Sequence, residues 1–242
     1  MIPRISGVLR RIGLLGEKPV RGIIPKKVIA RFVPSDPIVI EAGAHVGVDT
    51  VEMAKRWPRG TIYAFEPVPE LFEQLRLNTN RYRNVRCFQS AVGDKTGMTE
   101  IHISTGASDG SSSLLNPKEH LRIHPDVLFP RSVTVPITTL DDWAMKNAVS
   151  RVDLLWLDLQ GYELRTMMSS PKVLSTVSAI HSEVMLIESY EGNSLYKDLR
   201  PWLESAGFYV EKEEIPWDDS GNVLFIRRKQ TASRSFVKGA RG

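Results

Sequence analysis

The chain of 242 residues lacks the features that mark several classes of protein. Its single cysteine, Cys87, excludes an intramolecular disulfide and a cluster of thiolate metal ligands. No uninterrupted apolar run reaches the roughly 20 residues needed to span a bilayer. Arginines and glycines interrupt the apolar residues near the N-terminus, so the pattern of a signal peptide is missing as well. We therefore expect a soluble, cytoplasmic protein.

Positive charge is scarce in the middle of the chain and concentrated at both ends. The net charge is +4, of which residues 1–33 carry +7 and residues 227–242 carry +6, leaving −9 on the remainder. An acidic body argues against a nucleic-acid partner. We expect the basic ends to be solvated tails, with peripheral contact to an anionic membrane surface as the alternative. Apolar residues among the N-terminal basic ones predict a helix that packs on the domain or lies on a membrane: Ile5, Val8, Leu9, Ile12 and Leu15.

The rest of the chain alternates between short β-branched runs and helical patterns. Strands are predicted at residues 38–40, 61–65, 85–89, 152–157 and 179–186, and helices at 48–57, 71–80 and 195–206. Residues 208–210 and 222–226 predict two final strands that form an antiparallel edge. This alternation is typical of an α/β fold, in which helices cover both faces of a mostly parallel, Rossmann-like sheet.

One region departs from the alternation. Strands predicted at residues 100–104 and 132–137 flank a polar loop, residues 105–130, and loops of this length are usually functional or disordered. We divide the chain into a basic N-terminal segment (1–37), one α/β domain (38–228) and a basic tail (229–242).

Residues that could bind a ligand or take part in a reaction follow the first two predicted strands, where open α/β sheets bind their ligands. The first strand leads into the turn Glu41-x-Gly43-Ala44-x-x-Gly47, which differs from the dinucleotide pattern G-x-G-x-x-G because His45 replaces its second glycine. The second strand leads into Glu66, whose carboxylate could accept hydrogen bonds from both hydroxyls of a ribose. Together they predict a nucleoside site. Glu41 favours a cationic or amine-bearing ligand over a phosphate.

Five segments, in the same order, resemble the motifs of the FkbM family of methyltransferases. They are residues 39–47, 63–67, 90–94, 135–141 and 152–163, and the resemblance extends over residues 38–227. It implies a Rossmann-like methyltransferase fold with S-adenosylmethionine as cofactor. It also implies a small-molecule acceptor, namely a hydroxyl on a sugar, polyketide or related metabolite.

The resemblance also implies roles for individual residues. The cofactor-binding residues would be Glu41, Gly43, Ala44, His45, Gly47, Glu66, Pro67, Ser90, Ala91, Val92 and Asp158. Within this set, Glu41 would lie near the amine of the cofactor. Candidate bases for the acceptor hydroxyl stand at the ends of the fourth and fifth main strands: Asp158, His181 and Glu183.

Two departures from the family pattern keep alternatives open. Trp156 stands where the family commonly has lysine, and Gln160 stands where it has glutamate. One alternative is therefore a non-catalytic nucleoside-binding module, and another is an enzyme that methylates a lipid-linked or surface glycan. A divalent metal on Asp158 and Glu183 is a less favoured alternative, since hard cations bind carboxylates. His181 could instead be an ordinary core histidine.

Overall fold

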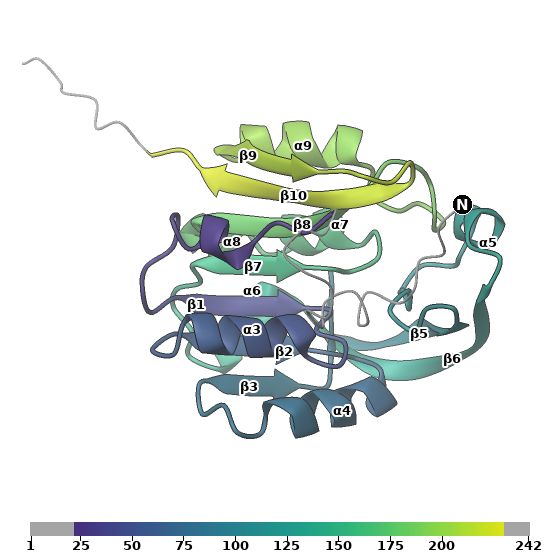
Figure 1. Cartoon of the computed structure of the whole chain (residues 1–242), viewed down its shortest axis with the longest axis horizontal. Coiled ribbons are helices and arrows are strands. Elements are labelled where there is room, and N and C mark those ends of the chain that lie inside the picture. Colours follow the sequence, from purple (N-terminus) through teal and green to yellow (C-terminus); the bar gives the residue numbers. More distant parts are fainter. Residues whose placement is uncertain (1–21, 230–242) are drawn as a thin grey trace, which may run out of the picture.

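A seven-stranded sheet forms the centre of the protein in the computed structural model, which describes residues 22–229 (Figure 1). The strand order is β3-β2-β1-β7-β8-β10-β9, and every neighbouring pair is parallel except the two pairs that involve β10. The strands are β1 (Ile38–Ala42), β2 (Thr61–Phe65), β3 (Val85–Phe88), β7 (Leu154–Leu157), β8 (Ala179–Met185), β9 (Phe208–Glu214) and β10 (Ser220–Arg227). The predicted mostly parallel α/β sheet is thus confirmed.

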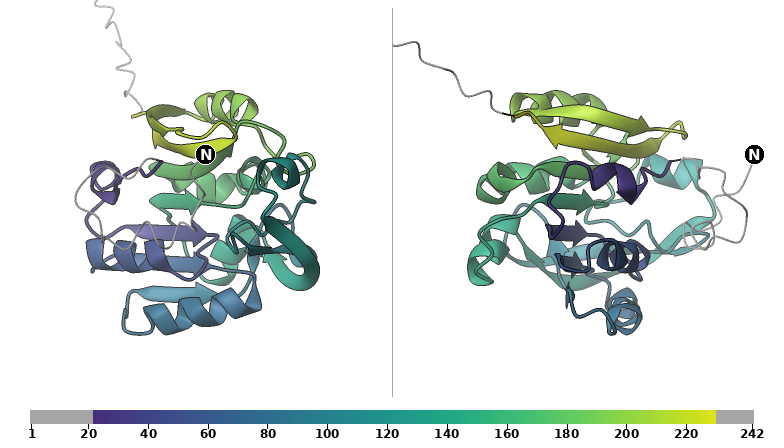
Figure 2. Two further views of the ribbon diagram at one scale, coloured as in Figure 1. Left: turned by 45° about the vertical axis from the view of Figure 1, so that its right-hand side comes forward. Right: turned by 60° about the vertical axis from the view of Figure 1, so that its left-hand side comes forward.

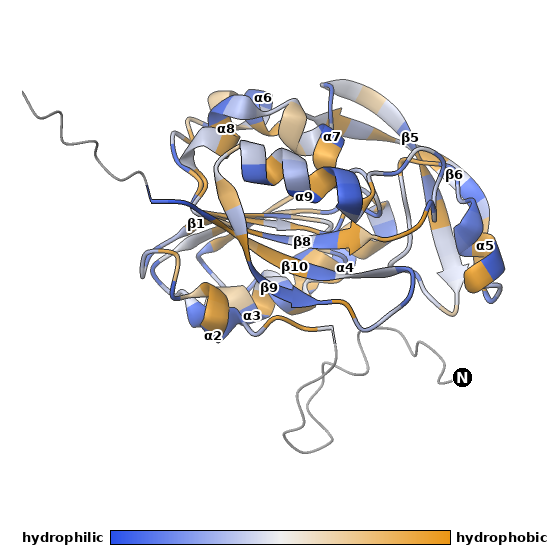
Figure 3. Ribbon diagram, turned by 90° about the horizontal axis from the view of Figure 1, so that it is seen from above, coloured by the Kyte–Doolittle hydropathy of each residue, from blue (hydrophilic) through white to orange (hydrophobic). Residues whose placement is uncertain are grey.

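Helices cover both faces of this sheet, because alternate residues of each strand point to opposite sides. Val39 joins one buried cluster and Ile40 joins the other. The first face carries α2 (Lys26–Ile29), α3 (Val48–Arg56) and α4 (Pro69–Thr79), and the second carries α6 (Leu140–Lys146), α7 (Glu163–Met168), α8 (Pro171–Thr176) and α9 (Tyr196–Ser205). Figure 3 shows α6 to α9 on one side of the strands and α2 and α3 on the other.

A second, three-stranded sheet lies at the carboxyl ends of the parallel strands. It consists of β4 (Ala91–Val92), β5 (Gly97–Gly106) and β6 (Val127–Thr138), in the order β4-β6-β5. The short helix α5 (Glu119–Ile123) belongs to the connection between β5 and β6. We call residues 97–138 the insertion. It comes forward on the right in the left-hand view of Figure 2.

The insertion differs from its prediction. Its two strands are several residues longer than the predicted 100–104 and 132–137, helix α5 was missed, and residues 91–92 form a strand of their own. Pro130 obscured the strand pattern, because proline normally interrupts a ladder. The pairing of β5 with β6 shifts register between Ile103 and Thr105, opposite this stretch of β6, and such an irregularity accommodates a proline.

Residues 22–33 pack into the main core. Ile24 and Ile29 are fully buried in the cluster that contains Val39 and Met53. The division of the chain at residue 37 stays a prediction, and the apolar residues predicted to form a helix between Ile5 and Leu15 lie outside the described residues. Between residues 22 and 229, no helix is long and apolar enough to cross a membrane.

Candidate active site

The turn after β1 brings the backbone close to its neighbours. Gly43, His45 and Gly47 all have left-handed backbone conformations, with φ values of 88°, 53° and 86°. A Cβ atom on Gly43 would lie 2.0 Å from the backbone oxygen of Asp158. Glycine at position 43 is therefore required for the ends of β1 and β7 to approach each other. The amides of Gly43 and Ala44 both donate to the backbone oxygen of Phe65, which ties the turn to the end of β2.

Glu66 lies beside this turn, immediately after β2. One carboxylate oxygen accepts a hydrogen bond from the amide of His45 (2.8 Å), and the other accepts one from the amide of Val68 (2.9 Å). Burial raises the pKa of Glu66 to about 7, although the two backbone hydrogen bonds oppose that change. Each carboxylate oxygen can accept a further hydrogen bond, so the group fits the two hydroxyls of a ribose.

Glu41 lies at the end of β1, and its predicted place near the amine of the cofactor stays a prediction. Its side chain is buried, and its carboxylate accepts a hydrogen bond of 2.5 Å from the hydroxyl of Thr50 in the first turn of α3. Glu41 therefore lies beneath the turn and anchors α3 to β1. The structure gives it no exposed surface from which to meet an amine of the cofactor.

The remaining residues predicted to bind the cofactor lie at the same end of the sheet. Pro67 follows Glu66, and Ser90 follows β3. The hydroxyl of Ser90 donates to the backbone oxygens of Ala91 and Pro136, at 2.9 and 3.2 Å. Ala91 and Val92 form β4, so this segment links the main sheet to the insertion.

Asp158, directly after β7, and Glu183, within the last three residues of β8, come together beside the turn after β1. The two strands are parallel, with Leu157 opposite Ser182, so the residues that follow stand side by side. The side-chain amide of Gln160 lies between their carboxylates, and its nitrogen is 2.7 Å from Asp158 Oδ1 and 2.6 Å from Glu183 Oε2. Asp158 is exposed and Glu183 is half-buried, so the structure brings two accessible acids together next to the turn after β1.

His181 does not stand at the end of its strand, where the sequence interpretation placed it. It lies two residues before Glu183, within β8, and it is buried. Its ring stacks on Trp156 with centroids 3.7 Å apart and planes 11° apart. The ammonium group of Lys26 lies 4.6 Å from the centroid of the Trp156 ring. His181 therefore belongs to the packed face under α2 and α3, where its ring is buried against Trp156.

Two loops converge on these residues. In the insertion, Asp109 lies 3.0 Å from the Nε2 atom of His45, and the hydroxyl of Ser113 donates to the backbone oxygen of Gln160. From the loop after β8, the fully buried Tyr190 places its hydroxyl 2.8 Å from the backbone oxygen of Ser111 and 2.9 Å from Gln160 Oε1.

Sequence reasoning missed Thr50 and Tyr190. Thr50 follows Gly47 by three residues, and a hydroxyl at the start of a helix beside a strand-end glutamate was a usable signal. Tyr190 had none, because it lies far along the chain in a loop of no recognisable pattern. Within residues 22–229, no group of three or more His, Cys, Asp or Glu side chains is arranged to hold a metal ion.

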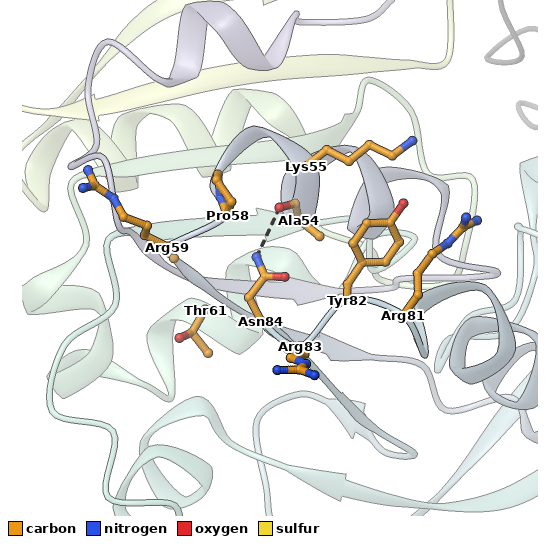
Figure 4. A pocket seen from close by; sticks show the side chains of 10 residues that line it. Ala54, Lys55, Pro58, Arg59, Thr61, Arg81, Tyr82, Arg83 and Asn84 are labelled. Carbon is orange, nitrogen blue, oxygen red and sulfur yellow. Dashed lines mark hydrogen bonds between the residues drawn. The ribbon is translucent and has the colours of Figure 1, made fainter.

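A separate hollow of about 550 Å³ lies at the opposite end of the strands, beside the start of β2 and between the end of α3 and the start of β3 (Figure 4). Four cationic side chains line it, from Lys55, Arg59, Arg81 and Arg83. Figure 4 shows that these side chains point in different directions, so they do not converge on one anion. The hollow contains none of the residues predicted to be functional.

Comparison with known proteins identifies the family. A family model described as the methyltransferase FkbM domain matches residues 41–210. The chain belongs to the FkbM methyltransferase family. This membership confirms the predicted S-adenosylmethionine-dependent methyltransferase, whereas the roles of its individual site residues remain predictions.

Several named proteins resemble this FkbM-family chain. It is 28% identical to the 2-O-methyltransferase NoeI of Sinorhizobium fredii over 219 residues, which cover 88% of this chain and 89% of NoeI. It is 23% identical to the 31-O-demethyl-FK506 methyltransferase FkbM of Streptomyces tacrolimicus, over 82% of each chain. Among solved structures, methyltransferase FkbM from Methylobacillus flagellatus is 11% identical with a TM-score of 0.49, covering 79% of this chain and 44% of that one.

Proposed function

We propose that this protein transfers the methyl group of S-adenosylmethionine to a hydroxyl oxygen of a sugar or polyketide-type metabolite. The observation that carries the proposal is the pair of accessible carboxylates, Asp158 and Glu183, beside the turn after β1. Two relatives support an oxygen acceptor, since their names describe a 2-O-methyltransferase and a 31-O-demethyl-FK506 methyltransferase.

The residues at this end of the sheet fit the cofactor. S-adenosylmethionine supplies, when bound, a methyl group activated by a positively charged sulfonium. The left-handed turn from Gly43 to Gly47 exposes backbone without side chains, and Glu66 accepts hydrogen bonds from the ribose. The negative charges of Asp158 and Glu183 complement a cationic ligand.

The same two acids serve the acceptor. A hydroxyl becomes a better nucleophile when a positioned base takes its proton during the reaction. A carboxylate oxygen of Asp158 or Glu183 takes that proton in our proposal, while the acceptor oxygen forms its new bond to carbon. The loops that carry Ser113 and Tyr190 hold the acids and their Gln160 partner in place, which is the orientation that such catalysis needs.

Isothermal titration with S-adenosylmethionine tests the cofactor site. We expect micromolar binding to the wild-type chain and a loss of about ten-fold or more, roughly 1.4 kcal/mol, in Glu66→Ala. Glu70→Ala is the matched control, because Glu70 is exposed on α4 and pairs with Arg131. An absence of binding to the folded wild-type chain would overturn the proposal.

A methyl-transfer screen tests the acceptor. The chain is incubated with S-adenosylmethionine labelled in its methyl group and with free sugars, nucleotide-linked sugars or hydroxylated polyketides. We expect an O-methylated product from one of these classes and a large loss of rate in Asp158→Asn or Glu183→Gln. Transfer only to a lipid-linked glycan would favour the glycan alternative, and cofactor binding without transfer to any acceptor would favour the non-catalytic module.

A further inference from the structure

We propose that Gln160 is a positioning residue that holds the carboxylates of Asp158 and Glu183 together at the acceptor end of the site. The inference rests on the proposed function, because it gives these two acids their role. It goes further because it says what orients the two acids: the neutral amide of Gln160, the hydroxyl of Tyr190 and the left-handed turn at Gln160 and Gly161.

The first argument is the use of both amide hydrogens. A glutamine side chain carries two N–H donors on one nitrogen, and here that nitrogen is within hydrogen-bond distance of one oxygen from each acid, at 2.7 and 2.6 Å. Two adjacent carboxylates repel each other, and a hydrogen bond to the charged form favours that form. The amide therefore offsets the repulsion without adding a charge.

The second argument is that the amide has only one favourable orientation. Its oxygen lies 2.9 Å from the hydroxyl of Tyr190, whose side chain is fully buried. Turned by 180°, Gln160 would present its oxygen to two carboxylate oxygens and its nitrogen to Tyr190. The first of these contacts is repulsive unless the acids are protonated, so the two acids select the observed orientation.

The third argument is the backbone that holds Gln160. Its φ of 51° is uncommon for a residue other than glycine, and left-handed residues of this kind cluster at functional sites. Gly161 follows with a φ of 96°, and a Cβ atom there would lie 2.5 Å from Cβ of Asn193. The hydroxyl of Ser113 donates to the backbone oxygen of Gln160. Four segments of the chain thus fix this one side chain.

The surrounding charges explain why a neutral donor is needed. Glu66 after β2 and Glu163 on α7 both interact electrostatically with Asp158. Asp109 of the insertion, which lies beside His45, interacts electrostatically with Glu66. An acid at position 160 would add another negative charge and remove both donors. A glutamate there could donate a hydrogen bond to either acid only while it carries a proton itself.

Thermal unfolding tests the assignment without any acceptor. Gln160→Glu should match the wild type near pH 5 and lose about 3 °C or more of melting temperature relative to it by pH 8, because the proton on the glutamate is lost as the pH rises. Gln74→Glu makes the same chemical change at an exposed site on α4 and should show no such divergence. A pH-independent difference between wild type and Gln160→Glu would overturn the assignment.

Side-chain amide NMR gives a second measurement, in which exchange is followed in the wild type and in Tyr190→Phe. In ¹⁵N-labelled wild-type protein, the signal pair that disappears in Gln160→Glu identifies the Gln160 amide. Both of its hydrogens should exchange slowly with water, and Tyr190→Phe should accelerate that exchange at least several-fold. We call the hydrogen bonds from the Gln160 amide to Asp158 and Glu183 the clamp. Rapid exchange in the wild type would contradict it.

The pH profile of methyl transfer then separates this inference from the proposed function. With an acceptor from the screen, the acid limb of kcat/KM should move about one pH unit higher in Gln160→Glu, and Tyr190→Phe should move it in the same direction. An unchanged limb in an active variant would refute the positioning role and leave the methyltransferase intact. No transfer by the wild type, combined with slow amide exchange, would refute the proposed function and leave the clamp.

Discussion

The carboxyl group of Glu66 is buried, and two backbone hydrogen bonds do not fully compensate for its loss of water. Its pKa of about 7 means that the unliganded protein carries a mixture of both protonation states at neutral pH. In the proposed site, the ribose hydroxyls would donate hydrogen bonds to the ionised form. Binding of the cofactor therefore favours deprotonation of Glu66.

This linkage predicts a pH dependence of cofactor affinity. Between pH 6 and pH 8, the ionised fraction of a group with a pKa near 7 rises about ten-fold, so the dissociation constant should fall by up to that factor. Titration calorimetry at several pH values measures it. Glu66→Gln is the reference, because it removes the ionisation of this side chain. If the dissociation constants of the two proteins changed with pH in parallel, the prediction would be contradicted.

Glu163 is a second buried carboxyl group with a raised pKa, and here the pKa affects the stability of the fold. Burial raises the pKa of Glu163 from 4.5 to about 7, although its carboxylate accepts hydrogen bonds from the amides of Leu159 and Gly161. The folded state therefore holds a proton that the unfolded state releases. The resulting stabilisation is complete below about pH 4.5 and is lost as the pH rises through 7.

We expect Glu163→Gln to remove this loss, because glutamine keeps an oxygen for the amide of Leu159 and has no charge to bury. Relative to wild type, the variant should gain up to about 3 kcal/mol in free energy of unfolding between pH 5 and pH 8. Urea unfolding at the two pH values checks this. Glu73→Gln, on the exposed side of α4, should change little, and an equal gain there would show that the effect is not specific to burial.

Among the structural elements, the insertion reaches the site through the loop at residues 107–113. Asp109 lies 3.0 Å from His45 in the turn after β1, and the side chain of Asp109 is 56% exposed. Exposed ion pairs contribute at most about 1 kcal/mol. The contact with His45 therefore holds Asp109 only weakly, whereas Ser111 and Ser113 in the same loop are held by buried hydrogen bonds. A weakly held Asp109 is compatible with local closure over a bound cofactor.

Asp109→Asn should accordingly raise the dissociation rate of S-adenosylmethionine by about two- to five-fold, with little effect on melting temperature. Stopped-flow displacement measures the rate. Asp126→Asn provides the control, since Asp126 is exposed elsewhere in the same insertion. If both variants dissociate like the wild type, the contact with His45 does not retain the cofactor.

The elements of the main sheet could be predicted because each strand is a short apolar run that ends in turn residues. Strand β7, for example, is apolar and buried on both faces, so its pattern is unambiguous. The insertion could not be predicted as well, since half-exposed strands containing Pro130 and Pro136 lack a clear period. The positions of Glu66 and Asp158 directly after strands could be predicted in the same way, while their roles stay predictions. The clamp around Gln160 depends on Tyr190 and Ser113, which only the folded chain brings together.

At the scale of the whole molecule, the N-terminal boundary of the folded unit has a direct test. Ile24 and Ile29 are fully buried, and losing each of them from the core removes roughly 2 kcal/mol of hydrophobic stabilisation. A chain that lacks residues 1–21 should melt near the wild-type temperature, whereas one that lacks residues 1–33 should melt far lower or not fold. Circular dichroism distinguishes these results, and equal melting of the two would show that α2 is dispensable.

The shorter truncation also tests the basic segment. Residues 1–21 hold five cationic side chains and one acidic side chain. If they mediate the peripheral contact with an anionic surface, the full chain should sediment with phosphatidylglycerol vesicles at low salt but not at high salt, and the truncated chain should not sediment at all. Sedimentation that is equal for both chains would assign the contact to another surface.

The two parts of the candidate site come from separate stretches of the sequence, which allows one to vary without the other. The turn after β1 and Glu66 come from the first third of the sequence, and both stand on strands of the main sheet. The insertion enters afterwards, as a single continuous segment that begins and ends beside β4. The insertion can therefore change as one unit while the turn after β1 and Glu66 keep their places on the main sheet, with Asp109 facing His45 as a contact between the two parts. Exchanging residues 97–138 between relatives is the corresponding laboratory operation.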